Sequence, residues 1–253
     1  MLAEELRIAV HAATKAGEEV LRLRREGLRY GHKGGWDLVT EADIRAAEIL
    51  HDALTGAFPG DGWLSEEHTD TSERLGRDRV WIVDPIDGTR EYLQGLPEYA
   101  ISIGLVIDGQ PALGVVHNPA TNEMHAAVSA EAQEAPELIV PGRRFDVLVG
   151  RGEQRWDEIP PLPPGCRSRG VGSVAYRLAL VAAGKGDAVL SAYGRSEWDV
   201  AAGIALCHAA GLRATDIFGR PLPFNQRDPH VRGLLVARPG LHRQLAKHIG
   251  RYG

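Results

Sequence analysis

We predict from the sequence a layered α/β (α+β) protein, and three observations support this fold class. Apolar residues recur at three- and four-residue steps from Leu2 to Leu21, which is typical of an amphipathic helix. Short apolar runs between residues 99 and 128 are divided by turn signals, as in an antiparallel meander. Helical and extended patterns then alternate between residues 172 and 249, which favours a second layer of helices on a sheet.

The first helix is expected to end by Gly27. Residues 31–35 then predict a glycine-rich loop, and a second helical pattern begins at Ile44. Thr40 or Asp43 is expected to cap this second helix, because both residue types accept hydrogen bonds from free backbone N–H groups at a helix start.

The central stretch is an apolar run, Trp81–Val83, that predicts a buried strand ending at Asp84 and Asp87. Pro85 disfavours helical geometry at Asp84, so both carboxylates should lie together at the end of the strand. Two anions this close repel unless a proton or a cation lies between them, and hard oxygen donors suit Mg²⁺ or Mn²⁺. The alternative is structural: Asp87 caps a short helix that begins near Thr89.

The chain is expected to divide into two domains, residues 1–143 and residues 144–253. Segments rich in proline, glycine and charge, residues 130–145 and 151–170, flank a single strand-like run at 145–150. The first domain, an α+β unit, would carry most of the metal site, and the second, an α/β unit, would carry Asp199 and the substrate contacts. Beyond the boundary we expect helices at 172–183, 199–210 and 239–249, with extended segments at 187–192, 213–216 and 233–237.

Composition excludes several classes of protein. A formal net charge of −5 and the lack of a basic run argue against binding to polymeric nucleic acid. No apolar stretch approaches the roughly 20 residues of a membrane span, and acidic residues near the first methionine do not suit a secretory leader. The two cysteines, Cys166 and Cys207, predict reduced thiols, so the expected location is the cytoplasm, with no membrane partner.

Five acidic residues stand at the end of an apolar segment or at a helix start, so one cleft could hold them all: Asp43, Glu66, Asp84, Asp87 and Asp199. Asp199 is the weakest member from spacing alone, because an aspartate before an alanine-rich helix is also a good N-cap.

Four motifs resemble, in order, the signature motifs of the inositol monophosphatase superfamily: Asp37–Asp43, Ser65–Glu67, Trp81–Thr89 and Trp198–Gly203. The resemblance runs from the first helix to about residue 240. It implies an αβαβα sandwich of the inositol monophosphatase and fructose-1,6-bisphosphatase type. It also implies a Mg²⁺-dependent, lithium-sensitive phosphomonoesterase.

The resemblance further implies metal ligands at Glu66, Asp84, Asp87 and Asp199 and at the carbonyl of Ile86. Together they would hold about two or three Mg²⁺ ions, or Mn²⁺, with Asp84 as our candidate for the bridging carboxylate.

The implied catalytic residues are Asp43, Thr89 and Glu66, with Thr89 and Asp43 orienting and deprotonating the attacking water. Backbone N–H groups at Gly88 and Thr89 would face a phosphate oxygen.

Substrate choice is indicated by smaller features. Thr89–Tyr92, Glu197–Asp199 and Asp216–Asn225 resemble the 3'(2'),5'-bisphosphate nucleotidase branch. Arg177 falls where those enzymes tend to have lysine, and Ala192 falls where inositol phosphatases use a glutamate. The expected substrate contacts are therefore Gly88, Thr89, Arg90, Gly172, Ser173, Arg177 and Glu197.

We predict that the substrate is a small phosphate ester, with 3'-phosphoadenosine 5'-phosphate, cleaved to AMP and phosphate, as the first choice. Inositol 1-phosphate and fructose 1,6-bisphosphate are the alternatives within the superfamily. A non-catalytic regulatory or nucleotide-sensing protein is the alternative of another class, but it would be expected to lose some of the acids. A homodimer is left open as the assembly.

Overall fold

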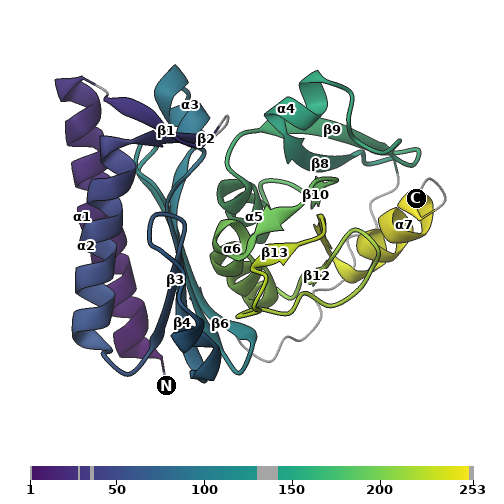
Figure 1. Cartoon of the computed structure of the whole chain (residues 1–253). Helices are drawn as coiled ribbons and strands as arrows, with labels where there is room; N and C mark the ends of the chain where they lie inside the picture. Colours follow the sequence, from purple (N-terminus) through teal and green to yellow (C-terminus); the bar gives the residue numbers. More distant parts are fainter. Residues whose placement is uncertain (1, 28, 35–36, 130–141, 251–253) are drawn as a thin grey trace.

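Two five-stranded sheets and the helices packed on them make up the fold. The structure is a computed structural model that describes residues 2–27, 29–34, 37–129 and 142–250. Figure 1 shows five layers: a helix pair, a sheet, a second helix pair, a second sheet and a final helix. The predicted αβαβα arrangement is therefore confirmed. None of the helices in the described ranges has the length and apolar character that crossing a membrane requires.

The outer helix pair consists of α1 (Ala3–Glu26) and α2 (Glu41–Ala57), which lie side by side against the first sheet (Figure 1). Small residues of α1 such as Ala9, Ala13 and Ala16 are fully buried, so the helix packs closely on its neighbours. The predicted end of α1 before Gly27 is confirmed.

Between these helices the structure differs from the predicted loop at residues 31–35. Residues 31–34 belong to strand β1 (Tyr30–Gly34), which pairs antiparallel with β2 (Asp37–Thr40). The loop prediction is wrong there because glycine also adopts extended backbone and the partner strand satisfies its backbone groups. Residue 35 lies outside the described residues.

The first sheet has the order β3-β4-β5-β6-β7, and its last three strands form the predicted antiparallel meander. Its strands are β3 (Gly62–Ser65), β4 (Arg79–Asp87), β5 (Ala100–Ile107), β6 (Gln110–Asn118) and β7 (Glu123–Val128). A 3₁₀ turn, η1 (Ser72–Gly76), precedes β4, and helix α3 (Thr89–Gln94) follows it. Because β3 and β4 are parallel, Ser65 lies opposite Val83, which brings Glu66 beside the end of β4.

The inner helix pair, α5 (Val174–Ala182) and α6 (Glu197–Ala209), lies between the two sheets (Figure 1). Most residues of α6 are buried, and glycines of the first sheet allow its close approach. A Cβ added at Gly114 would lie 2.1 Å from the carbonyl oxygen of Ala202. This close packing determines where the first turn of α6 reaches the sheet.

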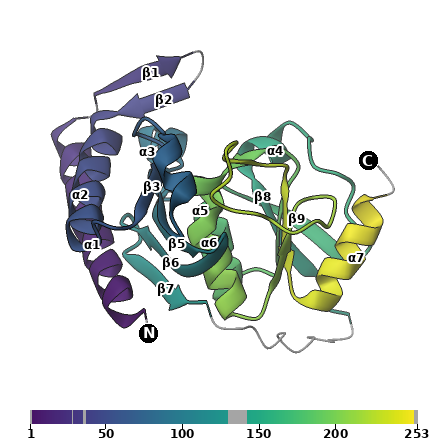
Figure 2. The same cartoon turned by 60° about the horizontal axis from the view of Figure 1, so that its bottom comes forward.

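The second sheet has the order β12-β14-β10-β8-β9. Its strands are β8 (Phe145–Gly150), β9 (Cys166–Val171), β10 (Ala188–Ser191), β12 (Arg213–Thr215) and β14 (Leu234–Ala237). A short pair, β11 (Arg195–Ser196) and β13 (His230–Val231), lies beside it, and α7 (Pro239–Ile249) covers its outer face (Figure 2).

The charged and glycine-rich stretch at 151–170 also contains regular structure that sequence patterns did not predict. The stretch begins with helix α4 (Arg151–Arg155) and ends in β9, an edge strand on which Arg167 and Arg169 are exposed. Gln154 of α4 donates to the carbonyl of Ser168 and accepts from the N–H of Gly170, so a side chain pairs with this edge. Charged edge strands lack the apolar alternation that identifies a strand.

The contact at Gly114 provides a first test. We expect Gly114→Ala to lower the free energy of unfolding by about 2–3 kcal/mol, because the methyl group would force α6 away from the sheet. Urea denaturation followed by circular dichroism measures this change. Gly56→Ala is the control: nothing lies within 4 Å of its added Cβ, and alanine in a helix should stabilise by about 0.5–1 kcal/mol. Equal stabilities of the two variants would contradict the packing argument.

Candidate metal centre and active site

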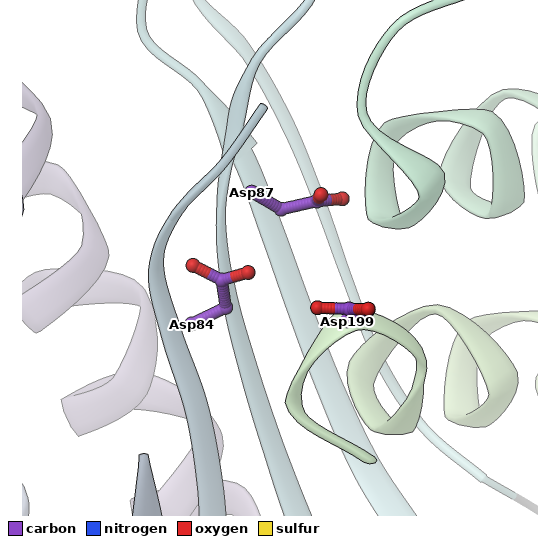
Figure 3. Close-up of side chains that lie close together, drawn as sticks. All are labelled: Asp84, Asp87 and Asp199. Atoms are coloured by element: carbon purple, nitrogen blue, oxygen red, sulfur yellow. The ribbon is translucent and has the colours of Figure 1, made fainter. Parts of the chain in front are cut away.

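Three aspartates meet where the first sheet faces the inner helix pair. Asp84, Asp87 and Asp199 each offer a carboxylate oxygen, and these oxygens all lie within 4.8 Å of one another (Figure 3). Asp84 and Asp87 come from the end of β4, and Asp199 comes from the first turn of α6. Asp84 is buried, whereas the other two are partly accessible.

A bulge in β4 explains why the two aspartates of that strand face the same way. Residues three apart on a regular strand point to opposite faces. Here Asp84 pairs with Ser102 and Asp87 pairs with Ala100, so the β4 segment has one more residue than its partner. The extra residue restores a common side for the two carboxylates. Within the bulge, the N–H of Ile86 donates to Oδ1 of Asp84 at 2.9 Å.

Asp87 does not cap α3, so the alternative of a simple helix cap is not what the structure shows. The N-cap of α3 is Gly88, at φ +97°, with no side-chain cap. Instead Oδ2 of Asp87 accepts from Oγ of Ser173 and from the N–H of Ala175, each at 2.6 Å. Asp87 therefore joins β4 to the start of α5.

Asp199 serves as a helix cap through one oxygen. Its Oδ2 accepts from the N–H of Ser196 at 3.0 Å, as part of a capping box at the start of α6. A carboxylate has lone pairs to spare, so capping by Oδ2 and ligation of a cation are compatible.

Asp43 also combines a capping role with a contact to Thr89, near the end of β4. Its Oδ2 accepts from the N–H of Thr40 at 2.7 Å, which completes the expected capping box of α2. Its Oδ1 accepts from Oγ1 of Thr89 at 3.0 Å, although the two residues are far apart in sequence. The same Thr89 hydroxyl lies 3.1 Å from the carbonyl oxygen of Ile86. One hydroxyl proton thus has two acceptors.

The cluster is electrostatically unfavourable without a cation. Burial, followed by the charges of Glu66 and Asp87, raises the pKa of Asp84 well above its usual range. Burial and the Asp87 charge raise the pKa of Asp199 to about 8. Burial also raises the pKa of Asp87, although the bond from Ser173 opposes this.

The donor set fits a divalent metal ion. Grouped carboxylates with a nearby backbone carbonyl are hard oxygen donors, which Mg²⁺, Mn²⁺ and Ca²⁺ prefer, and a cation would relieve their repulsion. Glu66 adds a further carboxylate beside the cluster, because its N–H donates to the carbonyl of Val83 at 3.3 Å, next to Asp84. The residues present can therefore hold such an ion.

The cluster opens into a cavity of about 500 Å³, the central cavity. Of the residues singled out in the sequence, its lining includes Glu66, Asp84, Ile86, Asp87, Gly88, Thr89, Arg90, Gly172, Ser173, Arg177 and Asp199. Asp43 lies behind Thr89 and is almost fully buried. Glu197 lies elsewhere: its two oxygens accept from the N–H groups of Asn225 and Gln226, so its contacts hold that loop.

The cavity also contains charged residues that sequence patterns did not single out. Glu153 lies 3.6 Å from Nη1 of Arg177 and 3.4 Å from Nη2 of Arg195. Despite the effect of burial, these two arginines keep the pKa of Glu153 below its usual range. No spacing rule links the three residues, because β8, α4, α5 and β11 meet only in the folded chain. The capping box of α4, in which Glu153 accepts from Gly150, was the one local signal.

Known proteins are similar to this chain in sequence and in fold. The inositol monophosphatase family profile matches residues 1–253. An inositol-1-monophosphatase of Mesorhizobium japonicum is 35% identical, covering 85% of this chain and 86% of the relative. A 3'-phosphoadenosine 5'-phosphate phosphatase of Mycobacterium bovis is 34% identical, covering 88% of this chain and 85% of the relative.

Two further comparisons extend over nearly the whole chain. A histidinol-phosphatase of Chlorobaculum parvum is 31% identical and covers 97% of this chain and 96% of its own. The solved inositol monophosphatase structure of Thermotoga maritima superposes with a TM-score of 0.80 at 25% identity, covering 98% of this chain and 97% of its own. The relatives thus act, by name, on three different phosphate esters.

The raised pKa values predict how pH acts on stability in the absence of metal. A carboxyl whose pKa is higher in the folded state holds its proton longer there, so the free energy of unfolding falls as pH rises from about 4 to about 8. Asp199→Asn removes one such group. In EDTA, the variant should be more stable than wild type by about 1 kcal/mol or more at pH 8, and this difference should shrink toward pH 5.

Thermal unfolding at several pH values measures the effect. Saturating Mg²⁺, at about 100 times its dissociation constant, should stabilise the wild type by about 3 kcal/mol and the variant by less. Asp228→Asn, an exposed carboxylate with 83% of its side chain accessible, is the control and should follow wild type. A pH-independent difference between Asp199→Asn and wild type would contradict the assignment.

Proposed function

The chain belongs to the inositol monophosphatase family of metal-dependent phosphoric monoester hydrolases, and on that premise we propose that it hydrolyses 3'-phosphoadenosine 5'-phosphate to AMP and phosphate. The scissile 3'-phosphate would lie at the aspartate cluster. The 5'-phosphate would bind to the cationic part of the central cavity, which contains Arg177 and Arg195.

For the metal centre we propose Mg²⁺, which would be held by Glu66, Asp84, Asp87 and Asp199 and by the carbonyl of Ile86. When bound, the cations neutralise charge that develops on the phosphate and the leaving oxygen and make water more acidic. The protein would hold these ligands rigidly, because Asp87 and Asp199 are each anchored by a backbone N–H at a helix start.

Thr89 and Asp43 would position and deprotonate the attacking water. The Thr89 hydroxyl donates its proton to Oδ1 of Asp43. The lone pairs of the Thr89 oxygen therefore stay available to accept a proton from water in the cavity. A proton taken by Thr89 can pass along the existing hydrogen bond to Asp43. Asp43 is held for this purpose by the capping bond from Thr40.

The bisphosphate proposal rests mainly on the buried and incompletely hydrogen-bonded side chain of Arg177. Its side chain is almost fully buried at the cavity wall, yet Nε and Nη1 have no hydrogen-bond partner among the described residues. Burial, followed by the charge of Arg195, lowers its pKa to about 10. Two arginines share one carboxylate, Glu153, so the group has a net positive charge. An anionic ligand beside the two arginines would balance this charge.

A monophosphate such as inositol 1-phosphate would leave this positive charge unbalanced once its phosphate lies at the aspartates. A hydrogen bond to a charged group contributes about 1.5–3 kcal/mol, so a substrate with a second phosphate should be preferred. Glu66, beside the aspartate cluster, also lines the cavity and would repel a second anion placed near it. The arginine pair is therefore the favourable place for the distal phosphate.

A variant of Thr89 tests the water-activating pair. We expect Thr89→Ala to lower kcat by about 100-fold or more with little change in KM, because the interaction is made chiefly in the transition state. Thr89→Ser retains the hydroxyl and should keep most of the activity. Mg²⁺ titrations of both variants should match wild type. If Thr89→Ala raised KM at constant kcat, Thr89 would be a binding residue and the proposed relay would be wrong.

A substrate panel tests the proposed function directly. At equal concentrations, the wild type should show its highest kcat/KM on 3'-phosphoadenosine 5'-phosphate, ahead of inositol 1-phosphate, fructose 1,6-bisphosphate and histidinol phosphate. Arg177→Lys keeps the charge but loses the planar fork, so KM for the nucleotide should rise about tenfold while inositol 1-phosphate is unaffected.

Arg169→Lys is the control, because Arg169 is exposed on β9 and is not among the cavity residues. It should behave as wild type on every substrate. Faster hydrolysis of a monophosphate by the wild type would overturn the bisphosphate proposal. Equal losses on both substrate types with Arg177→Lys would show that Arg177 has a general or structural role.

A further inference from the structure

Two exposed aromatic side chains lie at the rim of the central cavity. Trp156 is 66% exposed and Tyr193 is 48% exposed, and both belong to the cavity lining. The other large apolar side chains that are exposed in the described part of the chain lie outside that lining: Tyr30, Ile44, Val128 and Phe218. The metal chemistry and the phosphate contacts use neither Trp156 nor Tyr193.

The two aromatic residues come from separate segments that a shared anchor holds together. Trp156 ends α4, and Tyr193 follows β10 by two residues. Glu153 of α4 accepts from the hydroxyl of Ser191 at 2.7 Å and from the N–H of Ala192 at 3.1 Å. The carboxylate that faces the arginine pair therefore also joins these two segments, so the backbone that bears the aromatic residues has a defined position relative to the cationic site.

The guanidinium group of Arg155 lies over the indole ring of Trp156. The guanidinium carbon of Arg155 lies 5.3 Å from the ring centroid, and Arg155 is not part of the cavity lining. Arg155 therefore covers part of the indole from outside the cavity lining, to which Trp156 itself belongs. A polarised, exposed aromatic face is suited to stacking against a flat ring.

We infer that Trp156 and Tyr193 form a subsite for the purine base of the substrate, an inference that rests on the proposed function. The adenine base of a nucleotide is flat and aromatic, so it can stack on the exposed rings of the rim. Inositol and fructose phosphates offer no such face and gain nothing from the rim. The rim would therefore select nucleotides, while Arg177 and Arg195 select a second phosphate.

The test compares a nucleotide with the same molecule lacking its base. 3'-Phosphoadenosine 5'-phosphate and the abasic 1-deoxyribose 3,5-bisphosphate carry the same two phosphates. Trp156→Ala should raise KM for the nucleotide about 10-fold, within the range of roughly 5- to 100-fold expected for lost base stacking, and leave KM for the abasic compound unchanged. Trp156→Phe should restore most of the affinity for the nucleotide.

Equilibrium binding gives a second readout that is independent of turnover. In calorimetric titrations with Mg²⁺ present, Trp156→Ala should weaken AMP binding and leave ribose 5-phosphate binding unchanged. Phe218→Ala is the matched control, because Phe218 is 63% exposed and has an arginine, Arg220, 5.6 Å from its ring, yet it lies outside the cavity lining. It should leave both ligands unaffected.

The outcomes separate the two proposals. If the wild type prefers bisphosphates but Trp156→Ala changes nucleotide and abasic ligands equally, the base subsite is wrong and the proposed function stands. If the wild type prefers inositol 1-phosphate to 3'-phosphoadenosine 5'-phosphate and to the abasic bisphosphate, the proposed function itself fails. Tyr193→Ala should show the same selective loss for the nucleotide, and its absence would exclude Tyr193 from the subsite.

Discussion

The site depends on keeping three carboxylates together against their mutual repulsion. Asp84, Asp87 and Asp199 lie within 4.8 Å of one another, and each has an oxygen bound by a backbone N–H group. Two of these donors stand at helix starts, where free N–H groups and the helix dipole favour negative charge. The fold therefore compensates part of the repulsion, and the remaining charge provides the affinity for a cation.

The same anchors connect the layers of the fold. Asp87 joins the first sheet to α5, while Asp199 lies on α6, which packs against glycines of that sheet. On the other side, Asp43 links α2 to Thr89 after β4. A change in the helix packing would thus move the three aspartates and the Thr89–Asp43 pair together. Stability and activity are expected to share residues here, which is typical where charges are clustered for function.

Capping and function proved to be compatible uses of one carboxylate. Sequence patterns offered capping as an alternative to an active-site role at Asp43 and Asp199. The structure shows capping boxes at both residues, yet Asp43 also holds Thr89 and Asp199 also joins the cluster. A carboxylate has two oxygens with several lone pairs, so a capping hydrogen bond leaves acceptor sites for a second contact. A local pattern cannot show where the second oxygen points.

The sequence alone determined most of the helices, but not α4, together with the meander, the layered α/β class and the family, because periodicity, turn residues and the four motifs are local properties of the chain. Only the tertiary structure decided the β4 bulge, the strand status of residues 31–34 and 166–171, and the grouping of Glu153 with Arg177 and Arg195. It also brought Trp156 and Tyr193 to one rim. These features depend on pairing partners and buried charges that lie far apart in sequence, and no local pattern encodes such distances.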